Sequence, residues 1–314
     1  MALRVTLIHN QTAGDARHRA PAIVAILSRA GYCVTHFSSK TADLGRVLEL
    51  PADLVAIAGG DGTVAKVAAA AKPTGCPLAI LPLGSANNIA RSLGIDAPIE
   101  ELVSGWKTGT IRPFHLVHVA GPWGRRRVVE GIGVGAFARV VDEGAPDKSD
   151  TAQARSLIAT AIEACPPEHL EVYTETNRVS GDFLFFEITN IAMIGPNLCI
   201  APAADPSDDL VEICFVRNDP DQREAFLKWL LKTENDAPAP ISIFSSRKVT
   251  ISGKFQRMRM DDKVFKAERD VKWSDPTIVL EPETEALPFR PKVNPSTGST
   301  TPVPGHWAVA FMRV

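Results

Sequence analysis

The sequence predicts an α/β N-terminal domain built on a parallel sheet, followed by an all-β, sandwich-like C-terminal domain with inserted helices. Two patterns support this prediction. Over the first hundred residues, apolar strand-like runs alternate with segments of helical periodicity, which is typical of a parallel sheet with helices on both faces. From about residue 111, strand-like runs follow one another and are mostly separated by turn residues, which indicates antiparallel β structure.

In the first domain, short apolar runs mark the strands, and turn residues mark their ends. The strand at residues 54–58 is continuously apolar, as expected for a strand buried on both faces. Pro21 suits a first helical turn, and Gly94 suits a helix end. Strands are expected at residues 3–8, 34–37, 54–58 and 78–81, and helices at about 23–30, 44–48, 64–71 and 86–93.

In the second domain, strand-like runs are interrupted by two helical segments. One helix is expected at about residues 152–164, and another follows Asp219, which suits an N-cap before Pro220. Three phenylalanines, Phe183, Phe185 and Phe186, are interpreted as sandwich core, with an acyl-chain pocket as the alternative. The strands are expected at residues 170–176, 183–191, 210–216, 248–251, 255–260 and 277–281.

The chain is accordingly divided into three parts. The α/β domain is expected at residues 1–112, the β domain at 113–290 and a Pro-rich, loosely ordered tail at 291–314. A length of 314 residues is enough for two domains that each bury a core.

Composition and charge exclude several classes of protein. The chain has 34 Lys and Arg against 36 Asp and Glu, so no basic excess is available to hold nucleic acid by bulk charge. No apolar run approaches the roughly 18–20 residues of a membrane span, and the N-terminus turns polar too early for a signal peptide. The five cysteines lack a C-x-x-C pair and are expected to be buried thiols in a reducing cytoplasm.

The strongest functional motif is the segment Gly59-Gly60-Asp61-Gly62-Thr63, between a buried strand and a helix. Its glycines let the backbone turn tightly and bring N–H groups near an anion, and the following helix points its N-terminus there. Asp61 would repel a phosphate unless it binds Mg²⁺ or takes a proton from an attacking hydroxyl, and both roles belong to phosphoryl transfer. A glycine-rich turn with an Asp cap is the alternative.

Two further turns are expected at the same edge of the sheet. The carboxyl ends of adjacent parallel strands meet at one edge, where open α/β sheets bind ligands. Amide and hydroxyl side chains in these turns can donate hydrogen bonds to phosphate or ribose oxygens, although Ser and Asn are also ordinary helix caps. The residues concerned are Asn10 and Thr12 in one turn, and Gly84, Ser85, Asn87 and Asn88 in the other.

The order of these motifs resembles the diacylglycerol kinase catalytic domain family, which includes bacterial lipid kinases, ceramide kinases and sphingosine kinases. Later segments fit the same family: a glycine-rich stretch, an N-x-x-x-x-G…A-P-x-A stretch, and turns similar to its D-G-x-L-D and D-G-E motifs. These segments lie at residues 130–135, 190–204, 208–212 and 261–263. The resemblance covers about residues 3–281.

The resemblance implies a first domain like those of phosphofructokinase and NAD kinase, with ATP in the cleft between the domains and a lipid hydroxyl as acceptor. It implies that Asp61 holds Mg²⁺ or helps deprotonate the acceptor, and that Asp261 is the general base. Asp208 would belong to an ion-binding region. From the residues alone, the Asp261 segment is also explained by a hairpin turn. The implied ATP contacts are Asn10, Thr12, Gly59, Gly60, Gly62, Thr63, Gly84, Ser85, Asn87 and Asn88.

Two departures from the family pattern replace an acid with a lysine. Ala65-Lys66 stands where the family has Asn-Glu, and Asp262-Lys263 stands where it has the Gly-Glu of D-G-E. Both changes reverse the charge near the expected magnesium and triphosphate site. A lysine there either binds phosphate directly or disables a metal-bound network that needs acids.

Three functions are open at this point. The first is an ATP- and Mg²⁺-dependent kinase of a diacylglycerol- or sphingoid-like lipid, cytoplasmic and docking peripherally on the inner membrane face. The second is a nucleotide-binding member that has lost turnover, and the third is a kinase of a soluble acceptor such as NAD. No nucleic-acid partner is expected, and a homodimer is left open. The basic run at residues 125–127 is interpreted as a solvated hairpin turn, with contact to anionic headgroups as the alternative.

Overall fold

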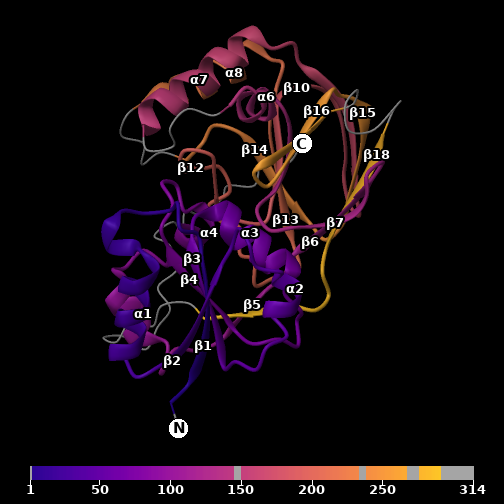
Figure 1. Ribbon diagram of the computed structural model, residues 1–314. Helices are drawn as coiled ribbons and strands as arrows, with labels where there is room; N and C mark the ends of the chain where they lie inside the picture. The colour runs from indigo at the N-terminus through magenta and orange to yellow at the C-terminus, as the bar shows by residue number, and fades with distance from the viewer. Residues whose placement is uncertain (1, 145–149, 233–237, 267–275, 291–314) are drawn as a thin grey trace.

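A computed structural model of the protein describes residues 2–144, 150–232, 238–266 and 276–290. Figure 1 shows two domains stacked one above the other, with the N-terminal domain in indigo and purple below the C-terminal domain in magenta and orange. This arrangement confirms the predicted order of an α/β domain followed by a β domain. The expected tail at residues 291–314 lies outside the described residues.

The first domain is built on a six-stranded sheet with the order β2-β1-β3-β4-β19-β5. Its first four strands are parallel, because β1 pairs with both β2 and β3 and β3 pairs with β4 in that orientation. Every residue of β3 is buried, as its continuous apolar sequence predicts. The strands are β1 (Arg4–His9), β2 (Cys33–Ser38), β3 (Leu54–Gly59), β4 (Leu78–Pro82), β5 (Arg112–Phe114) and β19 (Leu287–Phe289).

Helices cover both faces of this sheet. In Figure 1, α1 lies on one side of the strands, and α2 and α3 lie on the other. The helical segments are η1 (Ala16–His18), α1 (Ala20–Arg29), α2 (Leu44–Val47), α3 (Asp61–Ala70), α4 (Asn88–Ser92) and α5 (Ile99–Gly105).

The chain returns to the first sheet near the end of the described residues. Strand β19 pairs in parallel with β4 and antiparallel with β5, and the Phe289 and Phe114 rings lie 4.8 Å apart. The sequence predicts residues 113–290 in the second domain, whereas residues 113–114 in β5 and 287–289 in β19 join the first sheet. Domain membership therefore does not follow chain order at this end.

The second domain is an eleven-stranded sheet, in which the described pairings are antiparallel. Side chains from most of its strands pack into one apolar cluster, and helices pack against a second cluster. The strands are β6 (Val117–Gly121), β7 (Gly124–Val128), β8 (Gly131–Gly135), β9 (Glu168–Thr174), β10 (Arg178–Thr189), β13 (Val211–Arg217), β14 (Ser242–Ser246), β15 (Val249–Lys254), β16 (Arg257–Met260), β17 (Lys263–Lys266) and β18 (Thr277–Pro282).

Three helices and a small hairpin are inserted in this sheet. They are α6 (Ala136–Asp142), α7 (Thr151–Ala164), α8 (Pro220–Leu231), and the strand pair β11 (Met193–Ile194) and β12 (Leu198–Cys199). The sequence predicts two of the helices, at about residues 152–164 and after Asp219, but neither the helix at residues 136–142 nor the hairpin. Phe183, Phe185 and Phe186 are buried in the two clusters, which confirms that they are core residues. No helix among the described residues is long and apolar enough to span a bilayer.

The cysteines differ from expectation in their exposure. All five are free thiols, but of these only Cys214 is buried, and Cys33 is exposed. Cys33 begins β2, the edge strand of the first sheet.

Candidate active site

The two glycine turns meet at the carboxyl edge of the first sheet. Strand β3 ends at Gly59 and α3 begins at Asp61, while the next strand, β4, leads through Gly84 into α4. A Cβ atom placed on Gly84 would lie 2.6 Å from the Cα atom of Gly60, closer than any real side chain approaches. Glycine is therefore needed where the turns touch, and the predicted convergence of these motifs is confirmed.

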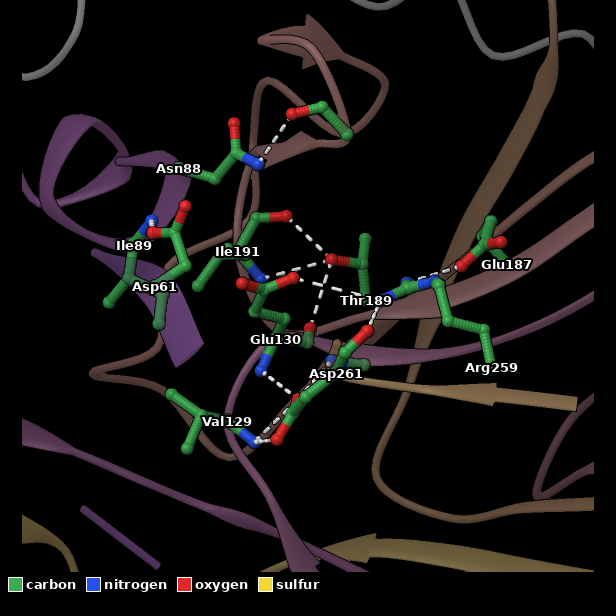
Figure 2. A network of polar contacts seen from close by, with 12 residues as sticks. Asp61, Asn88, Ile89, Val129, Glu130, Glu187, Thr189, Ile191, Arg259 and Asp261 are labelled. Carbon is green, nitrogen blue, oxygen red and sulfur yellow. Dashed lines mark hydrogen bonds and ion pairs between the residues drawn. The ribbon is translucent and has the colours of Figure 1, made fainter. Parts of the chain in front are cut away.

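Asp61 connects these turns. It is the first residue of α3 and is 8% exposed. Its Oδ1 accepts a hydrogen bond of 2.9 Å from the main-chain N–H of Ile89, in the first turn of α4 (Figure 2). The carboxylate thus satisfies one of the N–H groups that a helix start leaves without a partner. Its predicted role in metal binding or proton transfer stays a prediction.

The third turn reaches the same edge through Asn10. Asn10 Nδ2 donates a hydrogen bond of 3.3 Å to Thr63 Oγ1. Asn10 Oδ1 in turn accepts hydrogen bonds from the main-chain N–H and the hydroxyl of Thr12, at 3.2 and 2.9 Å. The structure therefore brings the three sequence-predicted turns together.

The polar residues after β4 have different surroundings. Asn87 adopts a left-handed conformation with φ of 51°, and its amide is hydrogen-bonded to Gly84 at both Nδ2 and Oδ1, so it stabilises its own turn. Asn88 donates from Nδ2 to the carbonyl of Gly195 in the second domain, at 2.9 Å. Ser85 is exposed. Asn88 is thus the member of this turn that bridges the domains.

Asp261 lies in the turn between β16 and β17, as the hairpin interpretation predicts. Its φ of 48° is a left-handed conformation that Asp tolerates. The carboxylate points to main-chain N–H groups and accepts hydrogen bonds from Glu130 at 2.8 Å and Val129 at 3.1 Å (Figure 2). Burial raises the pKa of Asp261 to about 6, and these two hydrogen bonds oppose that rise.

A buried ionic network stands behind Asp261. The Arg259 guanidinium donates from Nη2 to Glu187 Oε2 at 2.6 Å and from Nη1 to the Asp261 carbonyl at 2.7 Å. Glu130 Oε2 lies 3.6 Å from Arg259 Nη1. Arg259 and Glu187 are 2% and 0% exposed, and sequence reasoning missed both. The related feature of the sequence is the glycine-rich segment at residues 130–135, because in the structure a Cβ atom on Gly133 would lie 1.8 Å from Glu187 Oε1.

Two hollows meet at the Asp261 turn. We call the first the apolar cavity, of about 180 Å³, and the second the basic crevice, of about 480 Å³. Asp261 and Asp262 line both hollows, whereas Asp61 lines neither of them. The apolar cavity is lined by Asn88, Glu130, Phe137, Val140, Val141, Ala154, Ile158, Gly195, Pro196 and Arg259, and the basic crevice by Gly62, Ala65, Lys66, Ala69, Arg125, Arg126, Arg127, Val128, Met260, Lys263 and Phe265.

Asp208 lies in the loop before β13, beside other carboxylates. Burial raises its pKa, although a hydrogen bond from the main-chain N–H of Leu210 opposes the rise. The two neighbouring carboxylates already form ion pairs with other residues. Asp205 pairs with Arg112 at 3.2 Å, and Asp209 pairs with Arg247 at 2.6 Å. The metal role of Asp208 stays a prediction.

Comparisons with known proteins agree with this geometry. Residues 4–119 match the family model of the diacylglycerol kinase catalytic domain. A diacylglycerol kinase from Bacillus subtilis strain 168 is 25% identical over 231 residues, which cover 68% of this chain and 74% of the relative. A solved diacylglycerol kinase from Bacillus anthracis has a TM-score of 0.66 at 16% identity, covering 93% of this chain and 97% of that one.

A second solved structure extends the comparison. An NAD kinase from Archaeoglobus fulgidus, solved in complex with ATP, has a TM-score of 0.53 at 13% identity, covering 92% of this chain and 94% of that one. The two structural similarities show the fold, and they confirm the NAD kinase-like architecture that the family resemblance implies. Residues 4–119 of this chain are thus similar to the diacylglycerol kinase catalytic domain, and the chain is similar to bacterial proteins named diacylglycerol kinase.

Proposed function

We propose that the protein is an ATP-dependent phosphotransferase that moves the γ-phosphate to the hydroxyl of a diacylglycerol- or sphingoid-like lipid. The observation that carries this proposal is the junction of two hollows of opposite character. The basic crevice suits a triphosphate, the apolar cavity suits a hydrocarbon chain, and Asp261 and Asp262 line both.

The main-chain N–H groups of the first glycine turn support the proposal that a nucleotide binds here as the phosphate donor. Gly60 is the N-cap of α3, and Gly62 in its first turn lines the basic crevice. A helix N-terminus offers unpaired N–H groups and a favourable dipole to phosphate oxygens. The NAD kinase of similar fold was solved with ATP, and the same nucleotide is proposed here.

The apolar cavity supports a lipid acceptor that enters with its hydroxyl end inward. Apolar side chains of α6 and α7 line it, and Asn88 and Asp261 are among its polar lining residues. Asn88 is 2% exposed, and its Oδ1 has no hydrogen-bond partner among the described residues. Because a buried oxygen without a partner costs free energy, Asn88 Oδ1 is suited to bind the acceptor hydroxyl. The acceptor would be taken from a membrane surface.

Asp261 is the proposed general base. It takes the proton of the acceptor hydroxyl as that oxygen attacks the γ-phosphorus; the bond from the γ-phosphorus to the bridging oxygen breaks, and ADP leaves. A pKa of about 6 keeps the carboxyl ionised at neutral pH and still basic enough to accept a proton. Asp61 is proposed to position the two glycine turns, because it holds the N–H of Ile89.

The residues at this junction do not fit a magnesium ion held by the protein. Asp61 and Asp261 already accept main-chain hydrogen bonds, and Lys66 and Lys263 line the crevice where acidic ligands would be needed. Within the described ranges, no group of three or more His, Cys, Asp or Glu side chains is placed to hold a metal ion. No step of the proposed reaction is therefore assigned to Mg²⁺.

Transfer of label from γ-labelled ATP tests the proposal. The purified chain is incubated with diacylglycerol or sphingosine in mixed micelles, and with NAD in solution. We expect labelled lipid and no labelled NAD. Label in NAD alone would show a soluble acceptor instead. ATP binding without transfer to any acceptor would contradict the kinase proposal and favour a nucleotide-binding protein without turnover.

A further inference from the structure

The two lysines that depart from the family pattern line the same hollow. Lys66 comes from α3 and Lys263 from the start of β17, and both face the basic crevice. The β7 strand adds the three arginines of residues 125–127 to the crevice wall. Among the described residues, the crevice thus combines five cationic side chains with the two carboxylates of Asp261 and Asp262.

Two of these cations are neutralised by carboxylates. Arg127 forms a bidentate pair with Glu283, at 2.7 and 2.8 Å, and also donates to the carbonyls of Ala69 and Ala71. Arg125 lies 3.6 Å from Glu281. These contacts tie the β7 hairpin to its surroundings and leave little of their charge for a ligand.

The other three cations have no carboxylate partner within the described part of the chain. Lys66 Nζ donates to the carbonyl of Ser39 at 2.7 Å, which positions the ammonium without neutralising it. The Arg126 guanidinium lies over the Phe265 ring, 5.0 Å from its centroid. Lys263 is exposed at the hairpin end. The Asp261 carboxylate faces main-chain N–H groups, so it offsets these charges weakly.

One face of α3 forms part of the crevice wall between these cations. Gly62, Ala65, Lys66 and Ala69 recur at the spacing of one helix face along α3. Its alanines are small side chains beside Lys66. Its first turn adds the N-terminal dipole of the helix, and there a Cβ atom on Gly62 would lie 2.7 Å from Asp262 Oδ2. Lys66 and Lys263 belong to different domains and line the same crevice.

We propose that the basic crevice binds the phosphate groups of the donor directly, through Lys66, Arg126 and Lys263, and needs no divalent ion to do so. Lysine acts on phosphate as a point charge, and charge-assisted hydrogen bonds are stronger than neutral ones. The same side chains repel a divalent cation that acidic residues would attract. The identification of the ligand as the donor nucleotide rests on the proposed function. The inference that the crevice binds an anion does not depend on it.

Calorimetric titration of the full chain tests this inference. The ligands are ATP and inorganic tripolyphosphate, each titrated in EDTA and again with Mg²⁺. We expect both to bind in EDTA, with affinity that falls as salt rises. Lys66→Ala and Lys263→Ala should each weaken binding about tenfold, the loss expected for one charge-assisted hydrogen bond. Lys66→Arg and Lys263→Arg should restore most of it.

The matched control is Lys254→Ala, an exposed lysine on β15 outside both hollows. It should leave both affinities unchanged, and thermal unfolding should show that every variant is folded. ATP binding that requires Mg²⁺ and ignores both lysine variants would overturn the inference while leaving the kinase proposal intact. Tripolyphosphate binding without ATP binding would support the anion site and refute the claim that the donor nucleotide is its ligand. Binding of neither ligand would refute both.

Discussion

Asp261 combines two tasks in one side chain. Its left-handed conformation closes the β16–β17 hairpin, and its carboxylate holds the main-chain N–H groups of Val129 and Glu130. At the same time it lines both hollows. A general base has to be held in place and close to its substrate, and the hairpin provides the first of these requirements.

Asp261→Asn separates these tasks. The amide oxygen still accepts the two main-chain hydrogen bonds, and Asn tolerates the same backbone conformation, so the melting temperature should change little. Loss of the base should lower kcat for lipid phosphorylation by about 10²–10⁴-fold. Asp209→Asn, which alters an exposed carboxylate paired with Arg247, is the control. A wild-type kcat in Asp261→Asn would remove Asp261 from the reaction.

The pH dependence of kcat/KM for the lipid gives a second test of this residue. The pKa of Asp261 is raised to about 6 by burial, and only the ionised carboxylate can accept a proton. The kcat/KM should therefore rise as pH increases through about 6 and level off above pH 7. A pH profile of initial rates at subsaturating lipid measures this, and a profile that is flat between pH 5 and 7 would argue against the assignment.

Asp61 is expected to stabilise the folded protein as well as to position the two glycine turns. Asp61→Ala leaves the buried N–H of Ile89 without its acceptor, which should lower the free energy of unfolding by about 1–3 kcal/mol. Asp61→Asn keeps an acceptor oxygen and should lose less. Urea unfolding of the two variants measures the difference. Equal stability of Asp61→Ala and the wild type would show that this hydrogen bond does not anchor α4.

At the scale of single elements, strand β8 shows a structural use of a glycine-rich sequence. Its glycines allow close approach to β10, because a Cβ atom on Gly131 would lie 2.2 Å from the Ile188 carbonyl oxygen. Gly133 leaves the space that the Glu187 carboxylate occupies beside Arg259. The segment at residues 130–135 therefore supports the network behind Asp261, which is a packing role.

Gly133→Ala tests this role. The added methyl group would overlap Glu187 Oε1, 1.8 Å away, and overpacking of a buried site costs about 1–3 kcal/mol. Gly105→Ala in α5 is the matched control, because a Cβ atom there meets no atom within 4 Å. That control should be neutral or stabilising. Denaturant unfolding compares the two, and a similar effect of both substitutions would contradict the packing role.

At the scale of the whole molecule, the site is made by contacts between distant parts of the chain. The basic crevice joins α3 to the β7 strand and the β16–β17 hairpin, and the apolar cavity joins α4 to α6 and α7. Strand β19 then returns to the first sheet and holds the end of the second domain against it. Both hollows therefore depend on how the two domains are docked.

The stability of the whole protein should depend on pH through buried acids. Burial and the neighbouring Asp208 carboxylate raise the pKa of Glu212 from 4.5 to about 7. The folded protein therefore holds this proton more tightly than the unfolded chain, so its contribution to stability is present below about pH 4.5 and is lost as pH rises to about 7. The loss is at most about 3 kcal/mol at 1.36 kcal/mol per pKa unit.

Glu212→Gln removes this titration. Its free energy of unfolding should fall less than that of the wild type between pH 5 and pH 8, because the amide stays neutral throughout. Urea unfolding at both pH values measures the two differences. An unchanged pH dependence in the variant would show that Glu212 ionises normally in the folded protein.

The motifs of the first domain could be predicted because they are local. A buried strand, a glycine turn and a helix start follow one another within about ten residues, so Gly60, Asp61 and Gly84 could be assigned from the sequence. The parallel order of the strands then implied that these turns meet. Burial of the three phenylalanines followed from the same short-range patterns.

The order of elements, the two-part architecture and the glycine turns at the ends of buried strands were thus determined by the sequence alone, through periodicity and turn chemistry over short distances. Tertiary structure decided the return of β19, the pairing of Glu187 with Arg259, and the meeting of Lys66 with Lys263 in one crevice. These contacts join residues far apart in the chain, which leave no periodic signal. The charge and shape of the site therefore emerge only when the domains pack together.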